Sequence, residues 1–61
     1  MRQKREPPTK GETWVDRDRL EVSIDRVVRG RVTYTEEIML IIHDVALSTF
    51  MARYKKKEVI Q

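Results

Sequence analysis

The feature that most constrains the fold of this chain is a pair of consecutive valines that interrupts an alternating pattern. From residue 20 to residue 25, apolar and polar side chains alternate, as in a β-strand with one buried face. Residues 27–34, VVRGRVTY, continue as two short β-branched runs on either side of Arg29 and Gly30. That dipeptide suits a two-residue hairpin turn, so the segment predicts two antiparallel strands.

The two strands share an apolar face only if the first contains one extra residue. With a two-residue turn Val27 lies opposite Val32, but Tyr34 then faces Asp25 instead of an apolar side chain. A β-bulge near Asp25 and Arg26 corrects the phase. In that register the apolar face comprises Leu20, Val22, Val27, Val32 and the opposed pair Ile24 and Tyr34. A bulged, strongly bent hairpin is what a very small barrel requires.

The second half of the chain allows two interpretations. Residues 38–42 form the longest apolar run, and they fit either a third strand buried on both faces or the start of a helix that runs to about Tyr54. Residues 33–36 have the Thr-x-x-Glu form of a helix capping box, but the apolar residues spread around most of the circumference of such a helix. The expected elements are a strand to about His43, a short helix over residues 45–52 and a last strand over residues 54–60. A β-hairpin followed by one long C-terminal helix is the alternative.

The size of the chain allows one domain at most. A chain of 61 residues is near the lower limit for a core without staples, and this one has no cysteine for disulfides. Residues 1–10 contain Pro7 and Pro8 and are expected to form a flexible basic arm. Residues 11–61 are expected to form the single β-rich domain.

Charge gives only weak support for a nucleic-acid partner. The net charge is +3, but residues 1–12 and 55–61 each carry +2 and residues 13–54 carry −1, so the basic excess lies in the tails. The absence of cysteine favours the cytoplasm. The longest apolar run is far short of the roughly 20 residues of a membrane span, and no secretory signal is recognisable.

The sequence offers no set of residues suited to catalysis, a cofactor or a metal ion. His43 and Asp44 are the one His-carboxylate pair, and nothing places Ser48 or Thr49 beside them as a nucleophile. The acidic residues at positions 16, 18 and 21 lack the central glycine and terminal glutamate of a calcium loop. We therefore expect a protein that is not an enzyme and that uses no cofactor.

Five residues are candidates for a binding surface. Arg26, Arg29 and Arg31 are the basic cluster of the folded body, where they can contact phosphates or simply keep a turn soluble. Trp14 is either a core residue or, exposed beside Tyr34, part of an aromatic platform for a base or a proline-rich peptide.

Residues 11–34 resemble a group of short lambdoid phage and prophage proteins of unknown function. The shared pattern is a Gly-x-x-Trp-x-Asp opening, a Val-x-Ile strand and a Gly-Arg-Val-x-Tyr turn. The matching residues are Gly11, Trp14, Asp16, Val22, Ile24, Val27, Gly30, Arg31, Val32 and Tyr34. The segment around Phe50 and Tyr54 is similar to the closing aromatic segment of that group. The resemblance implies a small, bent, SH3-like β-barrel and adds nothing about catalysis. Together with the elements expected above, it gives a mainly β fold of four or five strands with a short helical segment near the C-terminus.

These observations predict a noncatalytic accessory or regulatory protein of a phage or prophage, located in the cytoplasm of the bacterial host. It is expected to bind a host or phage protein through one face of a small barrel. The apolar excess in residues 38–50 favours this target, because so short a chain cannot bury all of it, and it also allows self-association. A regulatory module that binds nucleic acid through the arginine hairpin and the basic tails is the alternative. No membrane partner is expected.

Overall fold

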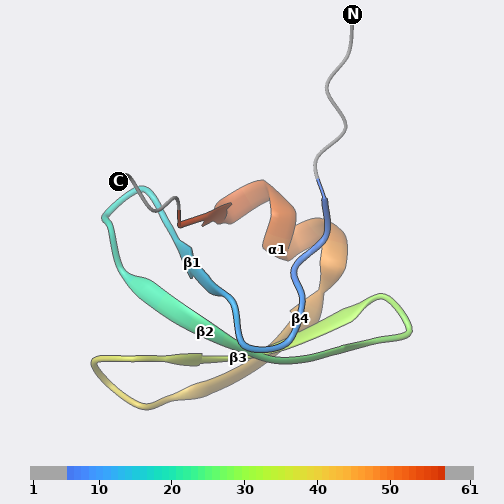
Figure 1. The fold of residues 1–61 in the computed structure, drawn as a ribbon, viewed down its shortest axis with the longest axis horizontal. Helices are drawn as coiled ribbons and strands as arrows, with labels where there is room; N and C mark the ends of the chain where they lie inside the picture. The colour runs from blue at the N-terminus through green and yellow to red at the C-terminus, as the bar shows by residue number, and fades with distance from the viewer. Residues whose placement is uncertain (1–5, 58–61) are drawn as a thin grey trace, which may run out of the picture.

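The computed structural model describes residues 6–57, which form one antiparallel sheet and one short helix. The elements are β1 (Thr13–Val15), β2 (Glu21–Val28), β3 (Arg31–Glu36), β4 (Ile42–Ala46), α1 (Leu47–Arg53) and β5 (Lys55–Lys56). The strand order across the open sheet is β4-β3-β2-β1-β5, and Figure 1 shows α1 on one side of the bent sheet. The predicted mainly β class with one short helix is confirmed.

A two-residue turn joins β2 to β3, as the sequence predicts. Arg29 and Gly30 have positive φ angles of 50° and 75°, which is the backbone geometry of a type I′ hairpin turn. Glycine adopts this region without steric cost. Val27 pairs with Val32 next to the turn, so both valines face the same side of the sheet.

The predicted β-bulge in β2 is also confirmed. The register shifts between Ile24 and Arg26, and Ile24 pairs with Tyr34. Asp25 is the extra residue, and its carboxylate accepts a hydrogen bond of 2.7 Å from the hydroxyl of Thr35. The bulge thus keeps the apolar residues on both sides of it on one face of the sheet.

The core lies between that face and α1. Its buried residues are Trp14, Val22, Ile24, Val32, Tyr34 and Phe50. Phe50 comes from α1, and its ring centroid is 5.2 Å from those of both Trp14 and Tyr34. Leu20 precedes β2 and is 43% exposed, so it does not join the apolar face as predicted.

The apolar run at residues 38–42 is not the buried third strand that its hydrophobicity predicts. β3 ends at Glu36, and the chain turns back through residues 37–41. Glu36 N donates to Ile41 O (2.9 Å), and Leu40 N donates to Glu36 O (2.7 Å), which closes the turn. β4 therefore begins at Ile42, later in the sequence than predicted. In this register Val45 pairs with Val32 and packs against the core.

A short helix over residues 45–52 was the prediction, and α1 at Leu47–Arg53 confirms it within two residues at each end. The alternative of one long C-terminal helix is wrong, because residues 42–46 pair with β3 as a strand. Of the last predicted strand, Lys55 and Lys56 pair with β1 as β5, and residues 58–60 lie outside the described residues.

The segment before β1 is tied to the sheet at its end. Residues 1–5 of the predicted arm lie outside the described residues, while Pro8 is buried. Gly11 N donates to Ile24 O (2.9 Å), and Ile24 N donates to Glu12 O (2.9 Å), so this segment pairs with β2. Within residues 6–57, no helix combines the length and the apolar character needed to cross a membrane.

Candidate functional site

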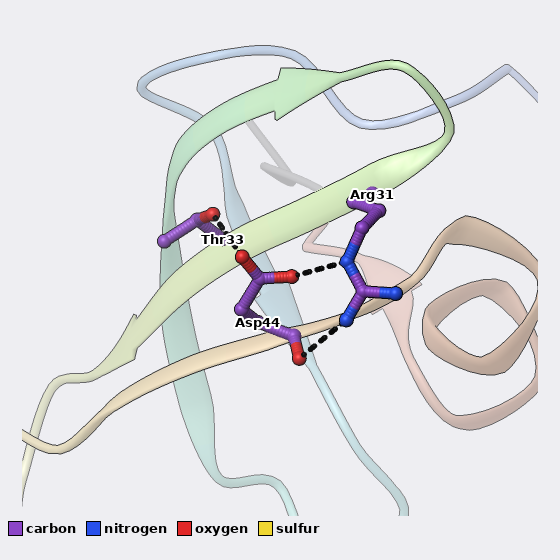
Figure 2. Close-up of polar contacts among 3 residues, drawn as sticks. All are labelled: Arg31, Thr33 and Asp44. Atoms are coloured by element: carbon purple, nitrogen blue, oxygen red, sulfur yellow. Dashed lines mark hydrogen bonds and ion pairs between the residues drawn. The ribbon is translucent and has the colours of Figure 1, made fainter.

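The three arginines of the β2–β3 hairpin have different environments. Arg31 Nε donates to Asp44 Oδ1 (2.7 Å), and Arg31 Nη2 donates to the backbone oxygen of Asp44 (3.2 Å), as Figure 2 shows. Thr33 Oγ1 lies 3.4 Å from the other carboxylate oxygen of Asp44. Arg26 and Arg29 are exposed and make no ion pair with residues 6–57. One of the three predicted phosphate ligands is therefore occupied by a carboxylate.

The two aromatic candidates for a stacking platform belong to the core instead. Trp14 is 2% exposed and Tyr34 is 3% exposed, because both side chains point to the face that α1 covers. Their rings contact Phe50 and leave no open face for a base or a peptide. Trp14 is therefore a core residue and not part of an exposed aromatic platform.

Glu12 holds Trp14 in place, a role that sequence analysis missed. Its Oε1 accepts hydrogen bonds from Trp14 Nε1 (3.0 Å) and from Thr9 N (2.9 Å), and its Oε2 lies 3.0 Å from Lys56 Nζ. These bonds lower the pKa of Glu12 from 4.5 to about 2, with the Thr9 backbone bond as the largest cause. The carboxylate joins the segment before β1, the core tryptophan and β5.

Acid should therefore weaken the fold through Glu12. A carboxyl whose pKa is lower in the folded state stabilises that state fully above its unfolded pKa, and this contribution is lost as the pH falls from about 4.5 to about 2. At neutral pH we expect Glu12→Gln to reduce the free energy of unfolding by about 1 to 2 kcal/mol. Urea unfolding at several pH values checks this: the gap between the two proteins should narrow in acid. An equal gap at every pH would contradict it.

His43 and Asp44 point to opposite faces of β4 and do not act together. His43 Nε2 is 2.5 Å from Glu36 Oε2, and its ring stacks on Tyr34 with centroids 5.1 Å apart. Asp44 is held by Arg31 on the other face. This arrangement stabilises the β3–β4 hairpin and gives no base-nucleophile pair.

A polar hollow lies between the β1–β2 turn and the end of α1. It has a volume of about 470 Å³ and is lined by Asp16, Arg17, Asp18, Ala52, Arg53 and Tyr54. Asp16 Oδ1 accepts hydrogen bonds from Asp18 N (2.8 Å) and Leu20 N (3.0 Å), which fixes the turn. The carboxylate of Asp16 thus has a structural role in this wall.

Most of the large apolar side chains that are exposed in residues 6–57 lie in the turn between β3 and β4 and at the start of β4. We call this segment the apolar tip. Its five residues, with their exposed fractions, are Ile38 (74%), Met39 (65%), Leu40 (74%), Ile41 (46%) and Ile42 (69%). None belongs to the core or to the apolar residues packed against it. Consecutive exposed apolar side chains of this size mark interaction sites.

Leu40 has a backbone conformation that leucine rarely adopts. Its φ angle is 58°, in the left-handed region where glycine and asparagine are favoured. The side chain is 74% exposed and gains no burial in return. The turn thus keeps a leucine in a strained backbone conformation with its side chain in solvent.

Acidic residues lie next to the apolar tip on the side where β3 enters it. Glu36 and Glu37 precede the tip. Glu37 N donates to Glu21 O (3.1 Å), which brings the first residue of β2 beside Glu37. Glu21 is paired with Lys57 (2.7 Å), while Glu37 makes no ion pair with residues 6–57. Leu20, next to Glu21, adds an exposed apolar side chain at the same end of the sheet. Sequence hydrophobicity marked this segment, but only the fold shows that it is exposed.

In comparisons with known proteins, no family model matches this chain, and no curated protein or solved structure has significant similarity to it.

Proposed function

We propose that this chain is a noncatalytic accessory or regulatory protein that binds another protein through the apolar tip. The observation that carries the proposal is the exposure of residues 38–42, five consecutive apolar residues at the end of a hairpin. The core contains none of them. Apolar side chains beside the Glu37 carboxylate, which is unpaired within residues 6–57, fit a groove that has an apolar floor and a basic group at its rim. The host or phage origin of the target rests on the resemblance of residues 11–34 to phage and prophage proteins. A cytoplasmic site of action is part of the proposal and is supported by the absence of cysteine.

An SH3-like barrel is the proposed finer class of the fold. Its support is the bulged β2 strand, since a bulge lets a short sheet bend towards closure. The lysines of β5 lie beside β1, as suits a strand that protects an edge. A fold of this kind does not determine function by itself.

Replacing Leu40 separates binding from folding. Leu40→Gly removes an exposed apolar side chain and relieves a left-handed backbone, so we expect the free energy of unfolding to stay equal or rise by up to about 1 kcal/mol. Binding of the target should weaken at least about tenfold, the effect of losing an anchor side chain. The measurement is capture of the target by immobilised protein, with urea unfolding of the same samples.

Val28→Thr is the matched control for this experiment. Val28 is also an exposed apolar residue, 53% accessible, but it lies at the other end of β3, beside Arg31. The control should capture as much target as the unchanged protein. Equal loss of capture in both variants would contradict a role specific to the apolar tip.

Nucleic acid is the second candidate target, because Arg26 and Arg29 project from the β2–β3 hairpin without ion pairs to residues 6–57. Phosphate contacts release counterions, so such binding falls steeply as salt is raised. Fluorescence anisotropy with mixed DNA and RNA at low salt tests it. A signal that salt and Arg29→Ala both remove would favour this candidate over a protein target.

A further inference from the structure

The outer edge of β4 has backbone groups that can accept another strand. β4 is the last strand in the sheet order, and no other strand among residues 6–57 pairs with it on that side. Leu47 N donates to Gly30 O (2.7 Å), and Glu36 N donates to Ile41 O (2.9 Å). In an antiparallel pair, residues that bond to the neighbouring strand alternate with those that do not. The N–H groups of Ile42, Asp44 and Ala46 and the C=O groups of Ile42 and Asp44 therefore point to the open edge, while the C=O of Ala46, the N-cap residue, belongs to the first turn of α1.

The two edges of the sheet are protected to different degrees. β5 forms one edge and is followed directly by Lys57, so three lysines lie along it. β4 contains no lysine, proline or bulge. Its one acidic residue, Asp44, is neutralised by Arg31 at 2.7 Å (Figure 2). The β4 edge thus lacks these three devices against strand addition, and the Arg31 side chain bonds to one of its outward backbone groups, because Nη2 donates to Asp44 O (3.2 Å).

We propose that the β4 edge pairs with the β4 edge of a second copy of this chain, antiparallel and about a two-fold axis at Asp44. This register uses all three outward residues, because Asp44 meets Asp44 of the second copy and Ile42 meets Ala46. The Asp44 pair at the axis gives two backbone bonds, and each of the two Ile42–Ala46 pairs gives one, from Ala46 N to Ile42 O, so four backbone bonds form. A register shifted by two residues, the next that keeps outward groups opposed, leaves Ala46 or Ile42 unpaired. The assembly is a continuous ten-stranded sheet, twice the five strands of one copy.

The side chains along this register are compatible. Ile42, 69% exposed in one copy, lies beside the small Ala46 of the other, and Val45 lies opposite His43. The two Asp44 carboxylates meet at the axis, where each already holds its own Arg31 guanidinium. Arg31 uses Nε and Nη2 for these bonds, so Nη1 can donate to the second carboxylate. The dimer then contains a row of two arginines and two aspartates, in which the arginines offset the repulsion between the two Asp44 carboxylates.

The charges at the two ends of the hairpins also favour an antiparallel partner. The turn at one end of β3 carries Arg29, and the turn at the other end carries Glu37. Antiparallel pairing brings the acidic end of one copy to the arginine end of the other, and parallel pairing does not. This complementarity is the reason for choosing a second copy as the occupant of the edge.

Ala46→Pro tests the proposal with little disturbance of the single chain. Ala46 has φ −64° and ψ 146°, which proline adopts, and its N–H does not bond to β3. Two of the four backbone bonds across the axis are lost, so the dimer dissociation constant should rise roughly thirtyfold or more. Sedimentation equilibrium of the full chain measures it: the unchanged protein should form a dimer and the variant a folded monomer.

Arg31→Ala gives a second test, in which the proposal and its alternative predict opposite changes in dimer affinity. On our proposal this variant leaves two carboxylates facing each other and weakens the dimer. If Arg31 instead shields the edge by covering the Asp44 oxygen, the variant associates more strongly, which overturns the proposal.

A single introduced cysteine reports the register directly, because the chain has none of its own. Asp44→Cys should oxidise to a linked dimer, since paired Cα atoms at about 5.5 Å suit a disulfide. Thr33→Cys, on the neighbouring strand, should not link. Equal linking of both variants, or an unchanged protein that stays monomeric or forms open-ended polymers, overturns the proposal.

This inference goes beyond the proposed function, because it concerns the backbone edge of β4 and not the side chains that bind the target. Leu40→Gly should lose target capture and keep the dimer. Ala46→Pro should lose the dimer and keep target capture at the apolar tip. Failure of either proposal can thus be recognised separately.

Discussion

Deletion of Asp25 is expected to leave the chain largely unfolded. Asp25 is the extra residue of the bulge, and without it the half of β2 before the bulge changes face. Val22 and Ile24, both buried, then point outward. Full burial of each is worth about 1.5 to 3 kcal/mol, and a domain of this size has only about 3 to 5 kcal/mol in total. Far-UV circular dichroism and urea unfolding measure the loss.

Asp25→Ala is the control for the deletion, because it keeps the residue count and removes only the side chain. Its carboxylate accepts one hydrogen bond from Thr35 (2.7 Å), so we expect a loss of about 1 kcal/mol. If the deletion and the substitution unfold at the same urea concentration, the bulge does not set the register.

Phe50→Ala is expected to have the second large effect. The ring is fully buried, with centroids 5.2 Å from Trp14 and Tyr34 and 4.7 Å from Tyr54. It is the one residue of α1 in the buried core, so its removal opens a cavity beneath the helix. Phe-to-Ala changes in cores cost about 3 to 5 kcal/mol, enough to unfold most of the population.

Thr49→Ala is the matched control on the same helix. Thr49 is exposed, so the change should alter the free energy of unfolding by less than about 0.5 kcal/mol. Thermal unfolding of both variants checks the pair. A Phe50→Ala protein as stable as the control would show that α1 does not close the core.

The register of the first hairpin could be predicted because it depends on neighbouring residues. A period-2 pattern, a two-residue turn and one extra residue in the first strand leave a single consistent apolar face, and the pairing of Ile24 with Tyr34 follows. The short helix could be predicted for a similar reason, since its position was limited by the segment before it and by the apolar residues within it.

The position of residues 38–42 could not be predicted, because hydrophobicity alone favours burial. The run contains no glycine, proline, asparagine or aspartate, the residues that usually mark a turn. In the fold, His43 and Val45 pair with β3, and the five apolar side chains of the run stay exposed at the end of the sheet. Glu12 was missed for another reason: its partners, a tryptophan, a lysine of β5 and a backbone amide, meet only in the folded chain.

Hydrogen exchange of the protein with its captured target tests the central claim most directly. A target held by the apolar tip should slow amide exchange at residues 37–42 and leave residues 26–31 unchanged. Slower exchange confined to residues 26–31, at the arginine hairpin, would contradict the assignment of the apolar tip as the binding surface.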